Sequence, residues 1–76
     1  MNRRVHVGPQ LKVVGETGDG VALEGELRLR PGQTIDLVLG GRSDVEAVVR
    51  SATVLSWAVV QLGTDGTIYR GLCRWQ

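Results

Sequence analysis

The chain has 76 residues, of which 42% are hydrophobic, and a net charge of +1 from nine basic and eight acidic side chains. This length allows one small domain, the apolar content is too high for a disordered chain, and the near-neutral charge argues against a general nucleic-acid binder. No apolar run approaches the roughly 20 residues that a membrane-spanning helix needs, and the basic N-terminus lacks the apolar core of a secretory signal. We therefore expect a cytoplasmic protein with no membrane span.

Residues 1–10 are predicted to form a flexible N-terminal segment, the usual fate of terminal residues, ahead of a single β-barrel domain that spans residues 11–76. Within this domain, glycine-rich turns separate short apolar runs, a spacing that is typical of a small sandwich or barrel. The strands expected from these runs, in chain order, are residues 11–14, 21–29, 34–39, 44–57, 58–62 and 67–75.

The clearest strand pattern covers residues 21–29. Aliphatic side chains fall on one parity and mostly charged ones on the other, so one face of the strand is expected to be buried and the other exposed. The inward set is Val21, Leu23, Leu27 and Leu29. Pro31 and Gly32 then end the strand. Within residues 44–57 the apolar parity changes, which predicts a β-bulge near residues 50–52.

Three glycine-rich stretches are expected to turn the chain. Residues 15–20 resemble a phosphate loop in composition, but a phosphate loop needs a following helix, and here a strand follows. We therefore expect a β-turn whose glycines adopt positive φ angles. Residues 40–41 and 63–66 are hairpin signals, the second because it contains Asp-Gly.

Six or seven short strands without a useful amphipathic helix predict an all-β fold, a small antiparallel six- or seven-stranded β-barrel. Such short strands leave sheet edges exposed, and a homodimer that covers one edge is an expected solution. The aromatic residues Trp57, Tyr69 and Trp75 are expected to fill the core or close one end of the barrel rather than form a stacking platform for nucleic acid. If they are exposed, a protein-contact patch is the better interpretation.

No residue set carries a recognisable catalytic chemistry. Hydrolase signatures are missing, and the carboxylates fall on outward strand positions where they are usually solvated, so we expect no enzyme. These carboxylates are Glu24, Glu26, Asp36 and Glu46. The single cysteine, Cys73, is expected to be a small buried hydrophobic residue. The single histidine, His6, has no second ligand nearby in the sequence, so neither a metal site nor a cofactor is expected.

One family resemblance runs through residues 11–75. The second-strand region of the PilZ domain contains an Asp or Asn, any residue, a Ser, two residues and a Gly, followed by a small-apolar strand. Residues 13–24 are similar to this region and read Val-Val-Gly-Glu-Thr-Gly-Asp-Gly-Val-Ala-Leu-Glu. The leucine, turn, glycine and strand segment that follows in the family resembles residues 29–37, Leu-Arg-Pro-Gly-Gln-Thr-Ile-Asp-Leu. Its closing strand is similar to residues 69–75, Tyr-Arg-Gly-Leu-Cys-Arg-Trp.

The resemblance implies a six-stranded antiparallel barrel that binds cyclic di-GMP in bacterial signalling. In the family, an Arg-x-x-x-Arg pair precedes the barrel, and paired arginines can fork onto phosphate oxygens or a guanine edge. Carried over to this sequence, the ligand-binding residues are Arg3, Arg4, Thr17 and Gly20. Two positions differ from the family pattern: Val7 or Gly8 stands where the second arginine belongs, and Gly15 stands where the Asp or Asn belongs.

Two functions from different classes therefore stay open at this point. The first is a small non-enzymatic binding module that is a cyclic di-GMP receptor or a degenerate PilZ-like domain. The alternative is a protein-protein interaction or dimerisation module that binds no nucleotide and uses exposed sheet edges. A small-barrel nucleic-acid binder ranks last, because the net charge is near zero and aromatic residues are few.

Overall fold

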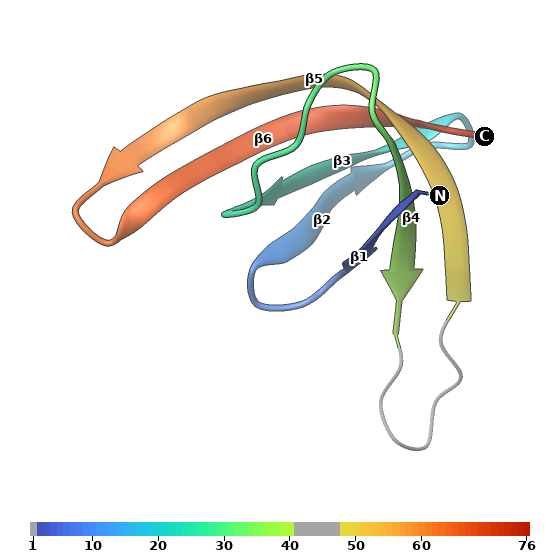
Figure 1. Ribbon diagram of the computed structural model, residues 1–76, viewed down its shortest axis with the longest axis horizontal. Coiled ribbons are helices and arrows are strands. Elements are labelled where there is room, and N and C mark those ends of the chain that lie inside the picture. The colour runs from blue at the N-terminus through green and yellow to red at the C-terminus, as the bar shows by residue number, and fades with distance from the viewer. Residues whose placement is uncertain (1, 41–47) are drawn as a thin grey trace.

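The computed structural model describes residues 2–40 and 48–76, which form one sheet of six strands (Figure 1). The strands are β1 (Arg3–His6), β2 (Leu11–Glu16), β3 (Gly20–Gly25), β4 (Thr34–Leu39), β5 (Val48–Gly63) and β6 (Gly66–Trp75). The expected all-β class is thereby confirmed. Within the two described ranges, no helix has both the length and the apolar character needed to cross a membrane. Gly41 of the expected hairpin and residues 44–47 of the expected long strand lie outside the described residues.

The strand order across the sheet is β1-β4-β5-β6-β3-β2. Neighbouring strands are antiparallel except β1 and β4, which run parallel with Val5 opposite Leu37. In the turn that joins the outer strands β1 and β2, one isolated bridge connects Gly8 and Leu11 through two backbone hydrogen bonds of 2.8 and 3.2 Å. The sheet is therefore mixed and not closed, so the antiparallel closed barrel expected from the sequence is not confirmed. Hydrophobic alternation says which face of a strand is buried, not which strand lies beside it.

The N-terminal segment differs from the flexible leader expected for residues 1–10. Arg3–His6 pair along their whole length with β4, and the side chain of Val5 is 2% exposed within the core. The Val7 N–H then donates to the carbonyl of Val38 at 3.0 Å. One buried valine and a parallel ladder thus make this segment part of the sheet.

The strand expected to include Leu27 and Leu29 ends earlier, at Gly25. A Cβ at Gly25 would run into the carbonyl oxygen of Gln10, so β3 and the chain ahead of β2 approach as closely as they do because this residue is glycine. The same carbonyl accepts the Glu26 N–H at 2.9 Å. Residues 26–33 form an irregular segment that connects β3 to β4. Leu29 of this segment still lies in the core, and Leu27 is half-buried.

The β-bulge predicted near residues 50–52 is wrong. The β4–β5 ladder runs through that region without a shift, and β5 instead shifts register against β6 at two later points. The extra residues there are Leu55 and Val60, both exposed. The parity pattern misleads because Val49, which belongs to the first apolar parity, is exposed, whereas Ala52 and Val54 of the second parity are buried.

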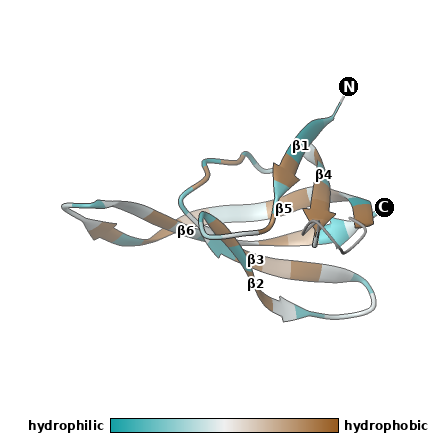
Figure 2. Ribbon diagram, turned by 90° about the horizontal axis from the view of Figure 1, so that it is seen from below, coloured by the Kyte–Doolittle hydropathy of each residue, from teal (hydrophilic) through white to brown (hydrophobic). Residues whose placement is uncertain are grey.

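The core lies on one face of the curled sheet, and Figure 2 shows hydrophobic residues on the strands around it. Its largest fully buried side chains are Leu11, Leu23, Ile35, Leu37 and Val54. Cys73 is buried as expected, and burial raises the pKa of its thiol. Alternate positions of β3 point inward, and the predicted burial of Val21 and Leu23 is confirmed.

β5 and β6 continue beyond the other strands as a two-stranded hairpin, residues 58–70, which we call the arm (Figure 1). β4 accompanies β5 only as far as Thr53, and β3 accompanies β6 only from Tyr69 to Arg74. At the tip, Gly66 has a φ of 140°, which suits the expected turn. The arm is therefore a hairpin whose two strands pair mainly with each other.

Candidate functional site

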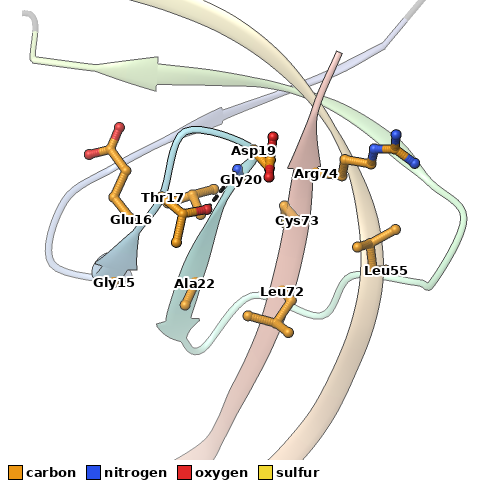
Figure 3. Close-up of a pocket in the computed structure, with 11 residues that line it drawn as sticks. Gly15, Glu16, Thr17, Asp19, Gly20, Ala22, Leu55, Leu72, Cys73 and Arg74 are labelled. Atoms are coloured by element: carbon orange, nitrogen blue, oxygen red, sulfur yellow. Dashed lines mark hydrogen bonds between the residues drawn. The ribbon is translucent and has the colours of Figure 1, made fainter.

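One groove lies on the face of the sheet opposite the core, with a volume of about 710 Å³ (Figure 3). We call it the outer groove. Figure 3 shows Ala22, Leu72 and Leu55 in a row across β3, β6 and β5. The β2–β3 turn borders this row on one side, and Arg74 borders it near β5. The groove thus has an apolar floor with polar and charged groups around it, the composition that small-molecule sites commonly have.

The β2–β3 turn is fixed by its own hydrogen bonds. The Thr17 hydroxyl accepts the Gly20 N–H at 3.2 Å, and the Thr17 N–H donates to the Gly20 carbonyl at 2.9 Å. The Trp75 N–H donates to the Asp19 carbonyl at 2.9 Å, which ties the turn to β6. Glycine is needed at position 20 for close approach, because a Cβ there would run into the carbonyl oxygen of Cys73.

The positive φ angles expected for the glycines of this turn are absent, since the positive-φ glycines among the described residues are Gly32, Gly40 and Gly66. The β-turn interpretation of residues 15–20 otherwise holds: β2 ends at Glu16 and β3 begins at Gly20. The Thr17 hydroxyl, which accepts a hydrogen bond inside the turn, stabilises the wall of the outer groove. The same hydroxyl still has a proton to donate toward a ligand.

Arg3 and Arg4 are neighbours in β1, so their side chains leave opposite faces of the sheet. Arg3 lines a second, polar pocket of about 570 Å³ together with Arg28, Arg30 and Gln33, which we call the arginine pocket. Arg4 instead lies opposite Asp36 in the β1–β4 ladder. The two arginines therefore do not act on one ligand from the same face.

Asp36 is held by several partners on the outer face. The Ser51 hydroxyl donates to its carboxylate at 2.7 Å and the Asn2 amide at 3.2 Å. These hydrogen bonds, with a smaller contribution from the charge of Arg4, hold the pKa of Asp36 below its ordinary value. Through these hydrogen bonds the Asp36 carboxylate ties β4 to Ser51 of β5 and to Asn2 ahead of β1.

Glu24 and Arg70 form an ion pair across β3 and β6. The Arg70 guanidinium donates through two nitrogens to one carboxylate oxygen, at 2.8 and 3.2 Å. This hydrogen bonding holds the pKa of Glu24 below its ordinary value. Of the predicted outward carboxylates, Glu24 and Asp36 are thus held by hydrogen bonds, Glu26 is exposed, and Glu46 lies outside the described residues. Over residues 2–40 and 48–76, no group of three or more metal-ligating side chains comes together.

The aromatic residues stabilise the inner face. Trp75 is 9% exposed, and the Arg50 guanidinium lies 4.1 Å from its ring centroid. Trp57 packs against the core, donates its indole N–H to the Leu27 carbonyl at 3.0 Å, and stacks on Tyr69 with ring centroids 6.4 Å apart. The expected core role is confirmed for Trp75, while Trp57 and Tyr69 are half-buried at the base of the arm.

The four predicted ligand-binding residues therefore separate into distinct places. Thr17 and Gly20 meet at the outer groove, Arg3 lies in the arginine pocket, and Arg4 lies beside Asp36. Sequence reasoning missed three arginines that border these two hollows: Arg28, Arg30 and Arg74. Alternation along residues 21–30 already placed Arg28 and Arg30 on the outward parity, but no sequence signal shows which distant strand each arginine faces.

Comparisons of the chain with protein-family models, with curated proteins and with solved structures found no match. The PilZ resemblance accordingly stays a prediction that rests on the residues quoted for it.

Proposed function

We propose that this chain is a non-enzymatic interaction module, a degenerate PilZ-like domain, that associates with a second copy of itself through the arm. The observation that supports the proposal most strongly is the exposed apolar character of the arm (Figure 2). Val59 and Val60 are each 49% exposed and Leu62 is 79% exposed. An isolated two-stranded hairpin is marginally stable in water, so these side chains favour a partner surface.

The edge of β5 supports the same proposal. Beyond Val54, which still bonds to Gln33, the outer edge of β5 has no strand beside it among the described residues. Unpaired backbone N–H and C=O groups on such an edge can pair with another strand, and proteins usually protect edges with charged side chains, proline or short length. Residues 51–64 contain no charged residue and no proline. This edge is therefore unusually open to pairing.

A second copy fits this edge better than an unrelated strand does. When two identical edges pair antiparallel about a two-fold axis, residue i of one copy contacts residue j of the other, and residue j contacts residue i. One segment therefore supplies both sides of the interface. Because residues 51–64 carry no charge, self-pairing brings no like charges together. The same pairing places the exposed valines of the two arms beside one another on the faces of the joined sheet.

We expect the protein to be a dimer by light scattering after gel filtration at micromolar concentrations, and Val60→Lys to make it a monomer. A lysine in the middle of the paired edges places two like charges opposite each other and desolvates both. Val48→Lys is the matched control, because Val48 is equally exposed on β5 but lies where β4 already occupies the edge. A monomeric wild-type protein, or a dimer that survives Val60→Lys, would contradict the proposal.

A second candidate function is cyclic di-GMP binding, and the outer groove favours it. Two of the four residues carried over from the family, Thr17 and Gly20, line this groove, and its volume lies in the range of small-molecule sites. Arg74 at the rim could supply the forked donor for a phosphate or a guanine edge.

Under this candidate, calorimetric titration with cyclic di-GMP gives a saturable signal that Arg74→Gln weakens about tenfold, since a good bidentate pair contributes about 1–3 kcal/mol. Arg70→Gln is the control, because Arg70 is already paired with Glu24. No signal with the wild-type protein removes this candidate and leaves the dimerisation proposal untouched.

A further inference from the structure

We propose that the arginine pocket binds the phosphate group of a small soluble phosphorylated molecule. Arg3 from β1 and Arg28 and Arg30 from the segment between β3 and β4 line one hollow of about 570 Å³. Three arginines from two distant parts of the chain thus line the same hollow. This site involves neither the arm nor the outer groove.

No carboxylate neutralises these arginines within the described part of the chain. The ion pair found there joins Arg70 to Glu24, on other strands. Three like charges in a shared hollow repel one another, and an anion placed between them converts that repulsion into attraction. The guanidinium fork matches the spacing of phosphate oxygens and remains charged at any ordinary pH. The chemistry of the pocket therefore selects an oxyanion with more than one negative charge.

The backbone beneath the arginines is well held. Leu29 is buried between Arg28 and Arg30, so the two flanking side chains both leave the core. The turn that follows is closed twice: the Gln33 N–H donates to the Arg30 carbonyl, and the Gln33 side-chain oxygen accepts the Arg30 N–H, both at 3.1 Å. Gly32 makes this turn possible with a φ of 88°.

Two further contacts attach the pocket to the sheet. Gly32 and Gln33 exchange backbone hydrogen bonds with Val54 of β5, at 2.7 and 2.8 Å. The Arg3 guanidinium donates to the Arg28 carbonyl at 3.5 Å, which keeps β1 beside the segment. Arginines on a fixed backbone lose less freedom on binding than arginines on a loose loop, which favours a specific site.

Size and charge decide between a small ligand and a polymer. A hollow of about 570 Å³ is larger than one phosphate group and falls in the range of small-molecule sites. The net charge of +1 gives little of the long-range attraction that nucleic acids need. The ligand class is therefore a phosphorylated small molecule whose phosphate sits among the three arginines.

The test is a titration of the full chain with inorganic pyrophosphate at constant ionic strength. Nuclear magnetic resonance of the backbone amides monitors binding at each step. We expect saturable shifts centred on Gly32 and Gln33, and at least tenfold weaker binding by the double variant Arg28→Gln with Arg30→Gln. Arg4→Gln is the matched control, since it removes the same charge from β1 on the opposite face and is expected to change the affinity less than twofold. Both variants alter exposed side chains, and their amide spectra also report whether the fold is kept.

Three outcomes overturn the proposal. The first is the absence of saturable shifts in the wild-type protein. The second is equal weakening by the double variant and by Arg4→Gln, which shows a diffuse charge effect. The third is binding to vesicles that contain phosphatidic acid without binding to pyrophosphate, which assigns the arginines to a lipid surface instead.

Discussion

Replacing Gly71 by alanine is expected to lower the free energy of unfolding by at least about 3 kcal/mol, or to prevent folding altogether. Gly71 is buried in β6 opposite Trp57 of β5. A Cβ at this position would run into the Ser56 carbonyl oxygen and the Trp57 ring. β6 has strands on both sides here, so its backbone cannot move away without breaking a ladder. Overpacking a well-packed site costs typically about 1–3 kcal/mol and more where backbone is struck.

The consequence is severe because the domain is small. A chain of 76 residues is expected to be stable by about 4–11 kcal/mol, from roughly 0.05–0.15 kcal/mol per residue. Urea unfolding followed by tryptophan fluorescence measures the loss. Gly18→Ala is the control, since a Cβ at Gly18 meets nothing within 4 Å, and its effect is expected to stay within about 0.5 kcal/mol. Equal stability of the two variants would show that the Trp57–Gly71 contact is not as tight as described.

Leu37→Ala is expected to destabilise the protein by about 2–5 kcal/mol. Leu37 is 0% exposed in β4, between β1 and β5, and it is among the largest fully buried side chains. Its truncation removes apolar burial and leaves a cavity whose walls belong to three strands, which limits how far the site can collapse. Thermal unfolding should show the loss as a fall in the melting temperature of about 10 °C or more.

The control for this prediction is Val48→Ala. Val48 lies on the same β4–β5 ladder, opposite Leu39, but its side chain is 58% exposed. Its truncation is expected to change the free energy of unfolding by about 0.5 kcal/mol or less. If the Leu37→Ala and Val48→Ala proteins had the same melting temperature, Leu37 would not be a core residue as the structure places it.

The arm and the arginine pocket give the molecule two surfaces of opposite character. The arm carries no charge along residues 58–64 and exposes several aliphatic side chains, whereas the pocket gathers Arg3 of β1 with Arg28 and Arg30. Association through the arm leaves the pocket open, because no residue of the arm lines it. Dimerisation and phosphate binding can therefore be tested separately, and loss of one need not remove the other.

Local sequence patterns predicted several elements well. The strand at Thr34–Leu39 has the predicted bounds, because Ile35, Leu37 and Leu39 fall on one parity and a Pro-Gly turn precedes the strand. The tip of the long hairpin was also correct, since Asp-Gly favours positive φ there. Predictions were poorest where a distant contact set the outcome. Gly25 ends β3 through its approach to Gln10, and no pattern within residues 21–29 contains that information.

The candidate sites show the same division. Thr17 and Gly20 were placed together correctly because four residues of one turn cannot lie far apart. Arg3 and Arg4 were both predicted to bind one ligand, yet strand formation at residues 3–6 sends their side chains to opposite faces. The partnership of Arg3 with Arg28 and Arg30 arises from the parallel pairing of β1 with β4, which no local pattern encodes.

Alternation and turn chemistry act within a few residues, and they were enough to predict an all-β protein, the burial of Val21, Leu23 and Leu29, and the position of most turns. Only the packing of distant strands shows that β1 joins the sheet in parallel, that the sheet stays open, that the arm projects with its valines exposed, and that three arginines line one hollow. These features depend on which strands lie side by side. That choice is made by the packing of the whole core and by close backbone approaches at a few glycines, not by the residues of any one strand.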